Sequence, residues 1–411
     1  MKIIAIPIAS SLHRREFYEE IFNLIKSKFI GIEVLNIVED EINNELIMKL
    51  ENSMPIIIVL TGGVSNLAMR IIKRSKIKRA ILISHSKHNS LASALSIKSK
   101  AEGIMIRNYF FKRSEDLDFI VKITEALNSL LGIRVGLISE ELSEYVDKFK
   151  EKLNAEVLLI GYDELNRDVE EEEINTILKF ISNKIDLTKA DKKLLERTIK
   201  LYLIIKKIML EKKLNGIAID CFPYLIKYGV TPCLAVSLLN DDGLVAACEA
   251  DLRSLLLMLI AKAIGKNSWM ANVASINGKE ITLAHCTIST KLTNECKLLN
   301  HFESGLPYSL ACTLKGHEFT MVGINREFSK IAALKVKLLR SGLLDENMCR
   351  TQAIFEAPID LGDFPNMALS NHHVIIHNNV INELKELAHL LSMDFTTYDK
   401  SFYISKEHYA P

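Results

Sequence analysis

The hydrophobic pattern of the first 131 residues alternates between short apolar runs and amphipathic stretches. The runs KIIAIPIA, IEVLNI, PIIIVLTGG and RAILISHS are rich in β-branched residues, and stretches such as RREFYEEIFNLIKSKF separate them. Strand–helix alternation of this kind is typical of a parallel, doubly wound sheet. We therefore expect an N-terminal α/β domain over residues 1–131.

The same alternation starts again at GIRVGLISEE and continues through AEVLLIGYDE and LNGIAIDCFPYL, with a long helical stretch at about 187–213. The acidic run DVEEEE precedes a helical pattern, and acidic side chains favour an exposed first turn because of the helix dipole. These features predict a second doubly wound α/β domain over residues 132–265.

After residue 265 the pattern becomes an alternation of single apolar and polar positions. The segments SWMANVASI, KEITLAHCTIS, GLPYSLACTL and HEFTMVGINR show it most clearly, and a helical pattern, INELKELAHLLSM, follows near the end. A period of two is typical of antiparallel strands with one buried face. We expect a β-rich, barrel-like C-terminal domain over residues 266–411.

Composition narrows the functional class. The chain has 411 residues, of which 48% are hydrophobic and 25% charged, and its 52 Lys and Arg nearly balance its 51 Asp and Glu, for a net charge of +1. This balance gives no electrostatic reason to expect a nucleic-acid or membrane partner. The N-terminal run is too short and too alternating for a signal peptide, and no apolar run approaches the roughly 18–20 residues of a spanning helix. We expect a cytoplasmic protein that acts on a small molecule.

The seven cysteines are scattered, and none of them forms a CxxC pair. Odd number and irregular spacing argue against a disulfide framework or a thiolate zinc site. Free thiols in a reducing cytoplasm are therefore the expectation from the sequence.

The segment CEADLRS places two carboxylates, Glu249 and Asp251, before an apolar helical run. On one helix these positions point about 200° apart, so they would not face one site. One would then cap the helix while the other faces a cleft. The simpler alternative is that both only interact with the helix N-terminus.

Histidines gather in three further segments. SNHHVII holds His372 and His373, which would point to opposite faces of a strand, so only one could join a given site. LAHCT contains His285, and NHFESG contains His301 and Glu303. A carboxylate, a histidine and an amide from distant segments could hold Mn²⁺ or Mg²⁺, although a structural role for the histidines is an open alternative.

In the first domain, SHSKHNSLAS places His85, His88 and Asn89 between the end of a strand and the next helix. The carboxyl ends of strands are where ligands bind in open α/β sheets. The nearby TGG is neither a Walker motif nor a GxGxxG motif, so it gives no independent prediction of a nucleotide site.

The order of these segments resembles the L-fucose isomerase-like proteins, a group that includes L-fucose and L-arabinose isomerases. The resemblance is carried by CFPYLIKYGVTPCLAVSLLNDDGLVAACEADLRSLLLMLI followed by SWMAN, AHCT, HFESG, CRTQ and NHHV, and by SHSKHNSLASALSI in the first domain. It covers nearly the whole chain and is strongest over 216–305. It implies two α/β domains with a β-rich C-terminal domain, and a Mn²⁺-dependent aldose–ketose isomerisation through an enediolate, with Mg²⁺ as the alternative ion.

The resemblance also implies residue roles. Glu249 would be a metal ligand and an acid/base catalyst, and His372, or His373 in a shifted register, would be another ligand. The family has Asp where this chain has Asn272, whose amide oxygen can bind a hard cation but cannot titrate. If that Asp were the general base, its loss would slow the reaction roughly 10²- to 10⁴-fold. His285 or His301 is then a candidate for the proton transfer, with His301 as the possible proton shuttle.

Family members assemble as trimers or hexamers in which a neighbouring subunit's first domain closes the active site. A homo-oligomer is therefore expected here, with His85, His88 and Asn89 contacting the sugar across an interface. His285 and Arg350 of CRTQ would also bind substrate, although Arg350 could equally stabilise a turn.

Two alternatives to the isomerase remain at this point. One is a sugar-binding or regulatory relative that has lost catalysis, which Asn272 favours. The other is a metal-dependent lyase on the same scaffold, which would share the enediolate chemistry. The sequence does not identify the sugar or show whether it is phosphorylated.

Overall fold

The computed structural model describes residues 2–51, 53–143 and 145–399, and the chain divides into two compact units, Met1–Gly132 and Ile133–Pro411. We call them unit 1 and unit 2. The three-domain division predicted from the sequence, with its second boundary at residue 265, stays a prediction.

Unit 1 is a parallel α/β sheet. Its strands are β1 (Lys2–Ile8), β2 (Glu33–Val34), β3 (Ser53–Val59), β4 (Arg79–His85) and β5 (Met105–Phe111), in the order β2-β1-β3-β4-β5. Its helices are α1 (Glu16–Lys28), α2 (Asn44–Leu50), α3 (Ser65–Arg74), α4 (Ser90–Lys100) and α5 (Ser114–Leu130). The central strands β1, β3 and β4 are buried almost throughout, because a parallel sheet in an α/β fold is covered on both faces.

Unit 2 begins with a second parallel sheet. Its strands are β6 (Arg134–Ile138), β7 (Glu156–Ile160), β9 (Gly216–Ile219) and β10 (Val245–Cys248), in the order β10-β9-β6-β7. The accompanying helices are α6 (Val146–Leu153), η1 (Tyr162–Leu165), α7 (Glu171–Ile181), α8 (Lys192–Glu211), α9 (Cys221–Tyr228) and α10 (Cys233–Asp241). The predicted acidic first turn is confirmed in α7, which starts with Glu171–Glu173.

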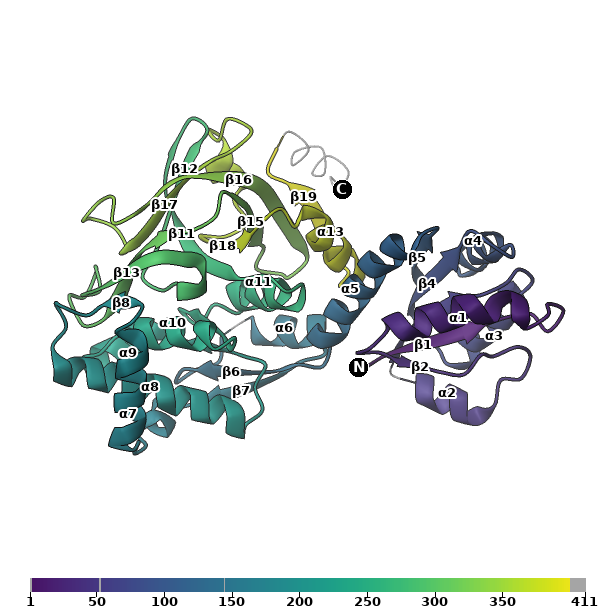
Figure 1. Ribbon diagram of the computed structural model, residues 1–411, viewed down its shortest axis with the longest axis horizontal. Helices are drawn as coiled ribbons and strands as arrows, with labels where there is room; N and C mark the ends of the chain where they lie inside the picture. The colour runs from purple at the N-terminus through teal and green to yellow at the C-terminus, as the bar shows by residue number, and fades with distance from the viewer. Residues whose placement is uncertain (1, 52, 144, 400–411) are drawn as a thin grey trace. The chain divides into compact units, whose positions relative to one another are not determined.

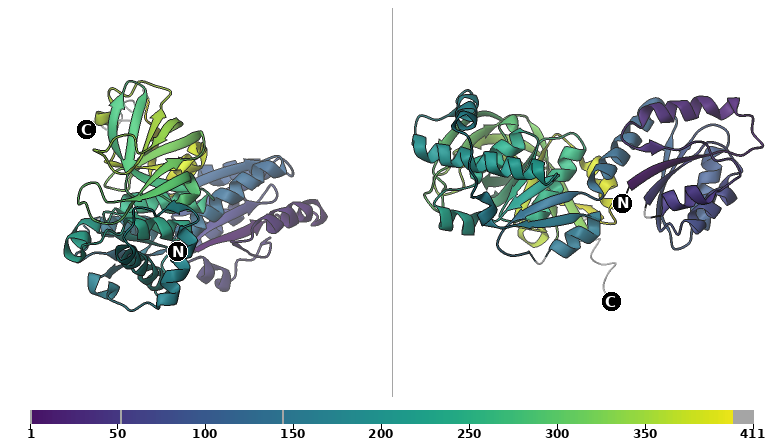
Figure 2. Two further views of the ribbon diagram at one scale, coloured as in Figure 1. Left: turned by 60° about the vertical axis from the view of Figure 1, so that its left-hand side comes forward. Right: turned by 90° about the horizontal axis from the view of Figure 1, so that it is seen from below.

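A closed antiparallel barrel follows, coloured green to yellow in Figure 1 and Figure 2. Its strands are β11 (Ser268–Asn277), β12 (Glu280–His285), β15 (Glu318–Ile324), β16 (Lys330–Gly342), β17 (Thr351–Glu356) and β18 (His372–His377). They run β15-β18-β11-β12-β17-β16, and pairing of β16 with β15 closes the ring. The predicted combination of parallel α/β sheets and a barrel-like C-terminal region is confirmed.

Smaller elements complete unit 2. The strands β8 (Ile185–Asp186), β13 (Thr293–Leu299) and β14 (Ser309–Leu314) form a three-stranded sheet beside the short helix η2 (Thr290–Leu292). Helices α12 (Phe364–Met367) and α13 (Ile381–Leu390) accompany the barrel, and β19 (Asp394–Thr397) pairs in parallel with β16.

The helix α11 (Leu252–Ala263) connects the parallel sheet to the barrel. Almost every side chain of this helix is buried, because it contacts β9 and β10 on one side and β11, β15 and β18 on the other (Figure 1). A helix that is apolar all round belongs in a core. Its first residue therefore lies deep in unit 2, between strand ends of both sheets.

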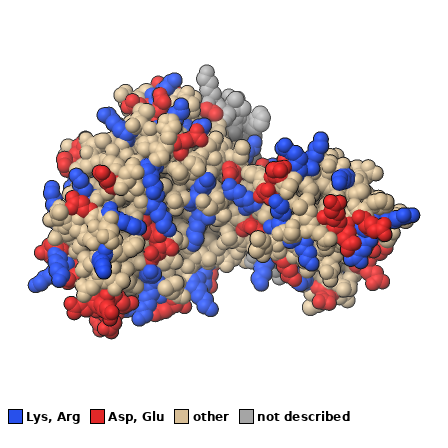
Figure 3. Space-filling view, in the orientation of Figure 1, with Lys and Arg blue, Asp and Glu red and all other residues tan. Residues whose placement is uncertain are grey.

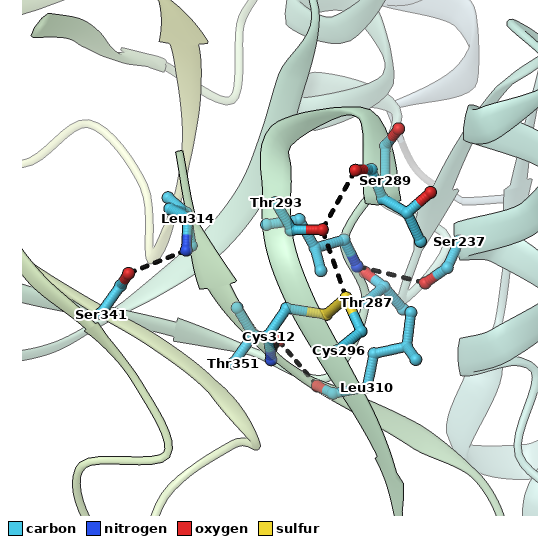
Figure 4. The surroundings of a disulfide bond; sticks show 12 residues. Ser237, Thr287, Ser289, Thr293, Cys296, Leu310, Cys312, Leu314, Ser341 and Thr351 are labelled. Carbon is cyan, nitrogen blue, oxygen red and sulfur yellow. Dashed lines mark hydrogen bonds between the residues drawn. A yellow bond between two sulfur atoms is a disulfide. The ribbon is translucent and has the colours of Figure 1, made fainter. Parts of the chain in front are cut away.

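The expectation of free thiols throughout is wrong for one pair. Cys296 of β13 and Cys312 of β14 form a disulfide (Figure 4). The two residues are direct partners in the antiparallel ladder, with 4.1 Å between their Cα atoms. This pairing depends on the register of a hairpin, and a separation of 16 residues does not reveal that register.

Basic and acidic side chains are interspersed over most of the face shown in Figure 3. In the described segments, none of the helices combines the length and the apolarity that crossing a bilayer requires. The predicted absence of nucleic-acid and membrane partners stays a prediction.

Candidate active site

Glu249 lies in a tight turn between β10 and α11. Glu249 and Ala250 both have left-handed backbones, with φ of 58° and 49°. Such conformations cost an L-residue roughly 1–2 kcal/mol and cluster at functional sites. Because the turn precedes the helix, the helical angle predicted between the two carboxylates does not apply. Glu249 lines a cavity while Asp251 caps the helix, which confirms the predicted division between the two.

Asp251 caps α11, as predicted. Its carboxylate accepts hydrogen bonds from the backbone N–H groups of Arg253 and Ser254 and from the Ser254 hydroxyl. The same carboxylate also accepts a bond of 2.8 Å from Nδ1 of His372. Asp251 thereby fixes the ring orientation of His372 and leaves Nε2 directed elsewhere.

Glu249, His285 and His372 form a compact cluster of donor atoms. Nε2 of His285 lies 3.6 Å from Glu249 Oε1, and Nε2 of His372 lies 3.4 Å from Oε2. One donor atom from each residue lies within 4.8 Å of the others. Both Nε2 atoms are buried and have no hydrogen-bond partner among the described residues. Buried imidazole nitrogens without a partner are rare in a native fold and need an explanation.

The charges of this cluster reinforce one another. Burial would raise the pKa of Glu249, but the imidazoles of His285 and His372 hold it well below its usual range. Burial would likewise lower the pKa of His372, but Asp251 and Glu249 raise it to about 9. Against its own burial, contact with His372 lowers the pKa of Asp251 to about 2. Both carboxylates are therefore ionised at neutral pH.

The two adjacent histidines of β18 have separate roles. His372 faces Glu249, whereas His373 points to the opposite face and contacts the Tyr398 hydroxyl at 2.9 Å. Burial lowers the pKa of His373 to about 4, so this ring is neutral. The alternation of a strand thus separates the two, and the structure brings His372, not His373, to the site.

Asn272 is the cross-strand neighbour of His372 in the ladder between β11 and β18. It lines the same cavity as Glu249 and His285, and its Oδ1 lies 3.5 Å from Nδ2 of Asn371. One carboxylate, two imidazoles and a nearby amide oxygen are a donor set suited to Mn²⁺ or Zn²⁺. The orphaned Nε2 atoms fit such an ion, because metal coordination would satisfy both.

A cavity of about 240 Å³ opens beside the cluster, entirely within unit 2. Its lining combines polar groups with thiols and two apolar side chains: Cys221, Phe222, Leu225, Cys233, Cys248, Glu249, Asn272, His285, Cys286, His301, Glu303 and Cys349. No lysine or arginine of the described chain lines it. A volume of this size suits a small polar molecule.

His301 lies in this cavity wall, as its predicted role requires. Its Nδ1 interacts with the Ser304 hydroxyl at 3.1 Å, and its Nε2 lies 3.8 Å from Glu303. Burial would lower the pKa of His301, but contacts with Cys286 and Glu303 raise it. The raised pKa favours the protonated form of His301, whereas the lowered pKa of Glu249 favours its ionised form.

Arg350 has its donors engaged in the loop before β17. Its Nε donates to the Asn300 carbonyl at 2.9 Å, and its Nη1 donates to Glu346 at 3.2 Å. These contacts match the alternative in which Arg350 stabilises a turn, and Arg350 does not line the cavity. Its contact with substrate stays a prediction.

The predicted residues of unit 1 lie at the carboxyl end of β4. His85 is buried, its Nε2 lies 2.9 Å from the Leu60 carbonyl, and its Nδ1 accepts from the Lys87 N–H. Burial lowers its pKa to about 4. His88 and Asn89 follow with left-handed backbones, φ 54° and 56°, and are more exposed. His85 supports its own loop, whereas the other two side chains are available for contacts.

Asp220 was missed at the sequence level. It follows β9 at the N-cap position of α9 but makes no side-chain capping bond, and its carboxylate accepts from the Ser139 hydroxyl at 3.2 Å. Burial, together with the charge of Glu249, raises its pKa. The rule that ligands bind at the carboxyl ends of parallel strands, applied to GIAIDC, would have found it.

Comparison with known proteins gives distant relatives with one shared name. A sulfoquinovose isomerase from Alkalicoccus urumqiensis is 21% identical over 304 residues, which is 68% of each chain. Sulfoquinovose isomerases from Priestia aryabhattai and Priestia megaterium are each 20% identical over 209 residues, or 47% of this chain and 46% of theirs. No protein-family model matches the chain. The relatives are sugar isomerases by name, which is the general class that the sequence resemblance implied.

Proposed function

We propose that this protein is a metal-dependent sugar isomerase that interconverts an aldose and a ketose. The observation that carries the proposal is the Glu249–His285–His372 cluster, whose two buried imidazole nitrogens lack hydrogen-bond partners among the described residues. The names of the distant relatives support the class of reaction.

In this proposal Glu249, His285 and His372 hold the ion, with the amide oxygen of Asn272 as a further ligand. The ion would supply positive charge that stabilises the enediolate character of the transition state. Asp251 keeps His372 in the orientation that presents Nε2 to the ion. Binding requires loss of the Nε2 proton, so affinity would increase with pH.

The chain's own residues would divide the proton transfers. Glu249 is ionised and can accept a proton from a substrate carbon or hydroxyl. His301, whose pKa is raised and which lines the same cavity, can donate one. Two groups whose environments push their pKa values apart are the usual arrangement for acid and base roles.

The test is ketose formation by the metal-stripped full-length protein with and without Mn²⁺. L-Fucose, L-arabinose and sulfoquinovose are incubated separately, and products are identified by NMR. The proposal expects a ketose of unchanged carbon number only when Mn²⁺ is present. Shorter products would instead indicate a lyase.

The second candidate function is a sugar-binding protein without catalysis. Asn272 favours it, since an amide cannot titrate and stands where the resembled family has Asp. Binding of both Mn²⁺ and a sugar without any ketose would select this candidate. Absence of Mn²⁺ binding would remove the isomerase proposal altogether.

A further inference from the structure

Helix α9 brings an apolar strip to the cavity beside the Glu249–His285–His372 cluster. Phe222 and Leu225 both line this cavity, and they lie three residues apart in α9, so their side chains are neighbours on one face of the helix. The other residues of the lining carry carboxylates, imidazoles, an amide and thiols. The cavity is therefore polar at the proposed metal site and apolar along α9.

The two side chains of this strip differ in exposure. Leu225 is 4% exposed and belongs to the core, whereas Phe222 is 39% exposed although it lines a cavity. Helix α9 begins at Cys221, so Phe222 lies in its first turn. Apolar area that remains in contact with water is area that a ligand can bury with a gain in free energy. The ring of Phe222 is therefore the part of the strip that a bound molecule would cover.

The orientation of the Phe222 ring is supported by His301. The centroids of the two rings lie 6.3 Å apart and their planes make an angle of 72°, which is an edge-to-face arrangement that aromatic pairs favour. His301 in turn contacts the Ser304 hydroxyl and lies 3.8 Å from Glu303. A ring that is already oriented before a ligand arrives loses less entropy on binding.

A sugar has two kinds of surface, because hydroxyl groups project from its carbon chain while its C–H groups form apolar patches. Aldose–ketose interconversion takes place at the first two carbons, which would lie at the metal cluster and leave the far end of the sugar for the apolar strip. We propose that Phe222 is a specificity-determining residue, on whose ring the C–H groups at the far end of the bound sugar stack. This inference rests on the proposed function for the identity of the ligand.

The charges around the strip define the substrate class further. Glu303 lines the same cavity, and it already offers a counter-charge to a protonated His301. No lysine or arginine in the described part of the chain lines the cavity. A phosphate or sulfate group placed against Phe222 would lose hydration and would have the carboxylate of Glu303 in the same cavity. The site therefore selects a sugar that carries no charge at its far end.

The test is a calorimetric titration of the full-length protein with sorbitol and with sorbitol 6-sulfate. Both probes are alditols, which have no carbonyl group and cannot isomerise, and they differ by one negative charge. We expect Phe222→Ala to weaken sorbitol binding roughly 3- to 10-fold, and Phe222→Tyr, which keeps the ring, to leave it unchanged. Sorbitol 6-sulfate should bind to the unmodified protein at least about 10-fold more weakly than sorbitol.

Phe180→Ala is the matched control, because Phe180 of α7 is 46% exposed and does not line this cavity, so sorbitol binding should stay unchanged. NMR transfer of magnetisation from labelled phenylalanine rings to the C–H protons of sorbitol gives a readout in the unmodified protein.

Unchanged sorbitol binding in Phe222→Ala, equal affinity for the two probes, or absence of magnetisation transfer would each overturn the proposal. None of these readouts requires ketose formation. Sorbitol binding that depends on Phe222, in a protein that forms no ketose, would contradict only the isomerase proposal.

Discussion

Two turns, one in each unit, share a pair of consecutive left-handed residues but differ in their chemistry. In unit 1, His88 and Asn89 lie in the loop between β4 and α4, with two residues between the end of β4 and His88. In unit 2, Glu249 and Ala250 follow β10 directly, and each pair consists of two consecutive left-handed residues. The neighbouring His85 in unit 1 has partners for both ring nitrogens. The comparison indicates that backbone strain alone does not identify a reactive site.

What distinguishes unit 2 is the state of its imidazoles. His285 and His372 have Nε2 atoms without a hydrogen-bond partner in the described part of the chain, and both face Glu249. As a result, the pKa values of His85 in unit 1 and His372 in unit 2 shift in opposite directions. Burial lowers that of His85 to about 4, whereas two carboxylates overcome burial and raise that of His372 to about 9.

The largest effect expected is that of Glu249→Gln. This change keeps the shape of the side chain but removes the charge that both imidazoles face and the proposed base. Ketose formation should fall roughly 10²- to 10⁴-fold. Glu346→Gln, the same change at an exposed side chain paired with Arg350, is the control and should keep full activity. Equal activities of the two variants would contradict the assignment of Glu249.

The second prediction concerns how the free energy of unfolding depends on pH. His372 in unit 2 and His85 in unit 1 should change it in opposite directions as pH rises. The raised pKa of His372 gives stability that is fully present below pH 6.5 and lost as pH rises through about 9. The lowered pKa of His85 gives stability that is present above pH 6.5 and lost as pH falls through about 4. Each contribution is about 3 kcal/mol.

Denaturant unfolding of the metal-free protein measures these contributions, and NMR of labelled histidine rings assigns them. The destabilisation caused by His372→Asn should shrink between pH 7 and pH 9.5, and that caused by His85→Asn should shrink between pH 7 and pH 4. The same pH dependence for both variants would show that the two histidines do not differ as described.

A smaller effect is expected from Asp251→Asn. Asn caps a helix about as well as Asp, so α11 should keep its start, but the charge that orients His372 is lost. Mn²⁺ affinity should fall roughly 10- to 100-fold. Asp191→Asn is the matched control, because Asp191 caps α8 through the Leu194 N–H and has no histidine partner among the described residues. A similar loss of affinity in both variants would mean that Asp251 acts only as a cap.

Much of this contrast between the units could be predicted from the sequence. Hydrophobic periodicity gave the parallel sheets and the β-rich region, and the motif order pointed to Glu249 and His372. The sequence did not predict that His285 lies beside Glu249. The register of β11 with β12 and β18 brings His285, at the end of β12, close to His372, at the start of β18. It also missed Asp220 and the Cys296–Cys312 disulfide, which depend on neighbours distant in the chain.

The smallest prediction concerns the strained turn itself. Ala250→Gly removes the left-handed strain at φ 49° and should raise the free energy of unfolding by about 0.5 kcal/mol. Ala261→Gly inside α11 is the control and should lower it by roughly 0.5–1 kcal/mol. Thermal or urea unfolding distinguishes the two signs. Destabilisation by Ala250→Gly would show that the turn is not strained in the unmodified protein.

The most direct test of the central claim is a Mn²⁺ titration of the metal-free protein followed by electron paramagnetic resonance, in which the free aqueous ion gives the signal. We expect one Mn²⁺ to bind per chain, and His285→Asn, His372→Asn and Glu249→Gln each to weaken that binding. The absence of bound Mn²⁺ at millimolar concentration, or binding that all three substitutions leave unchanged, would contradict the proposed metal site.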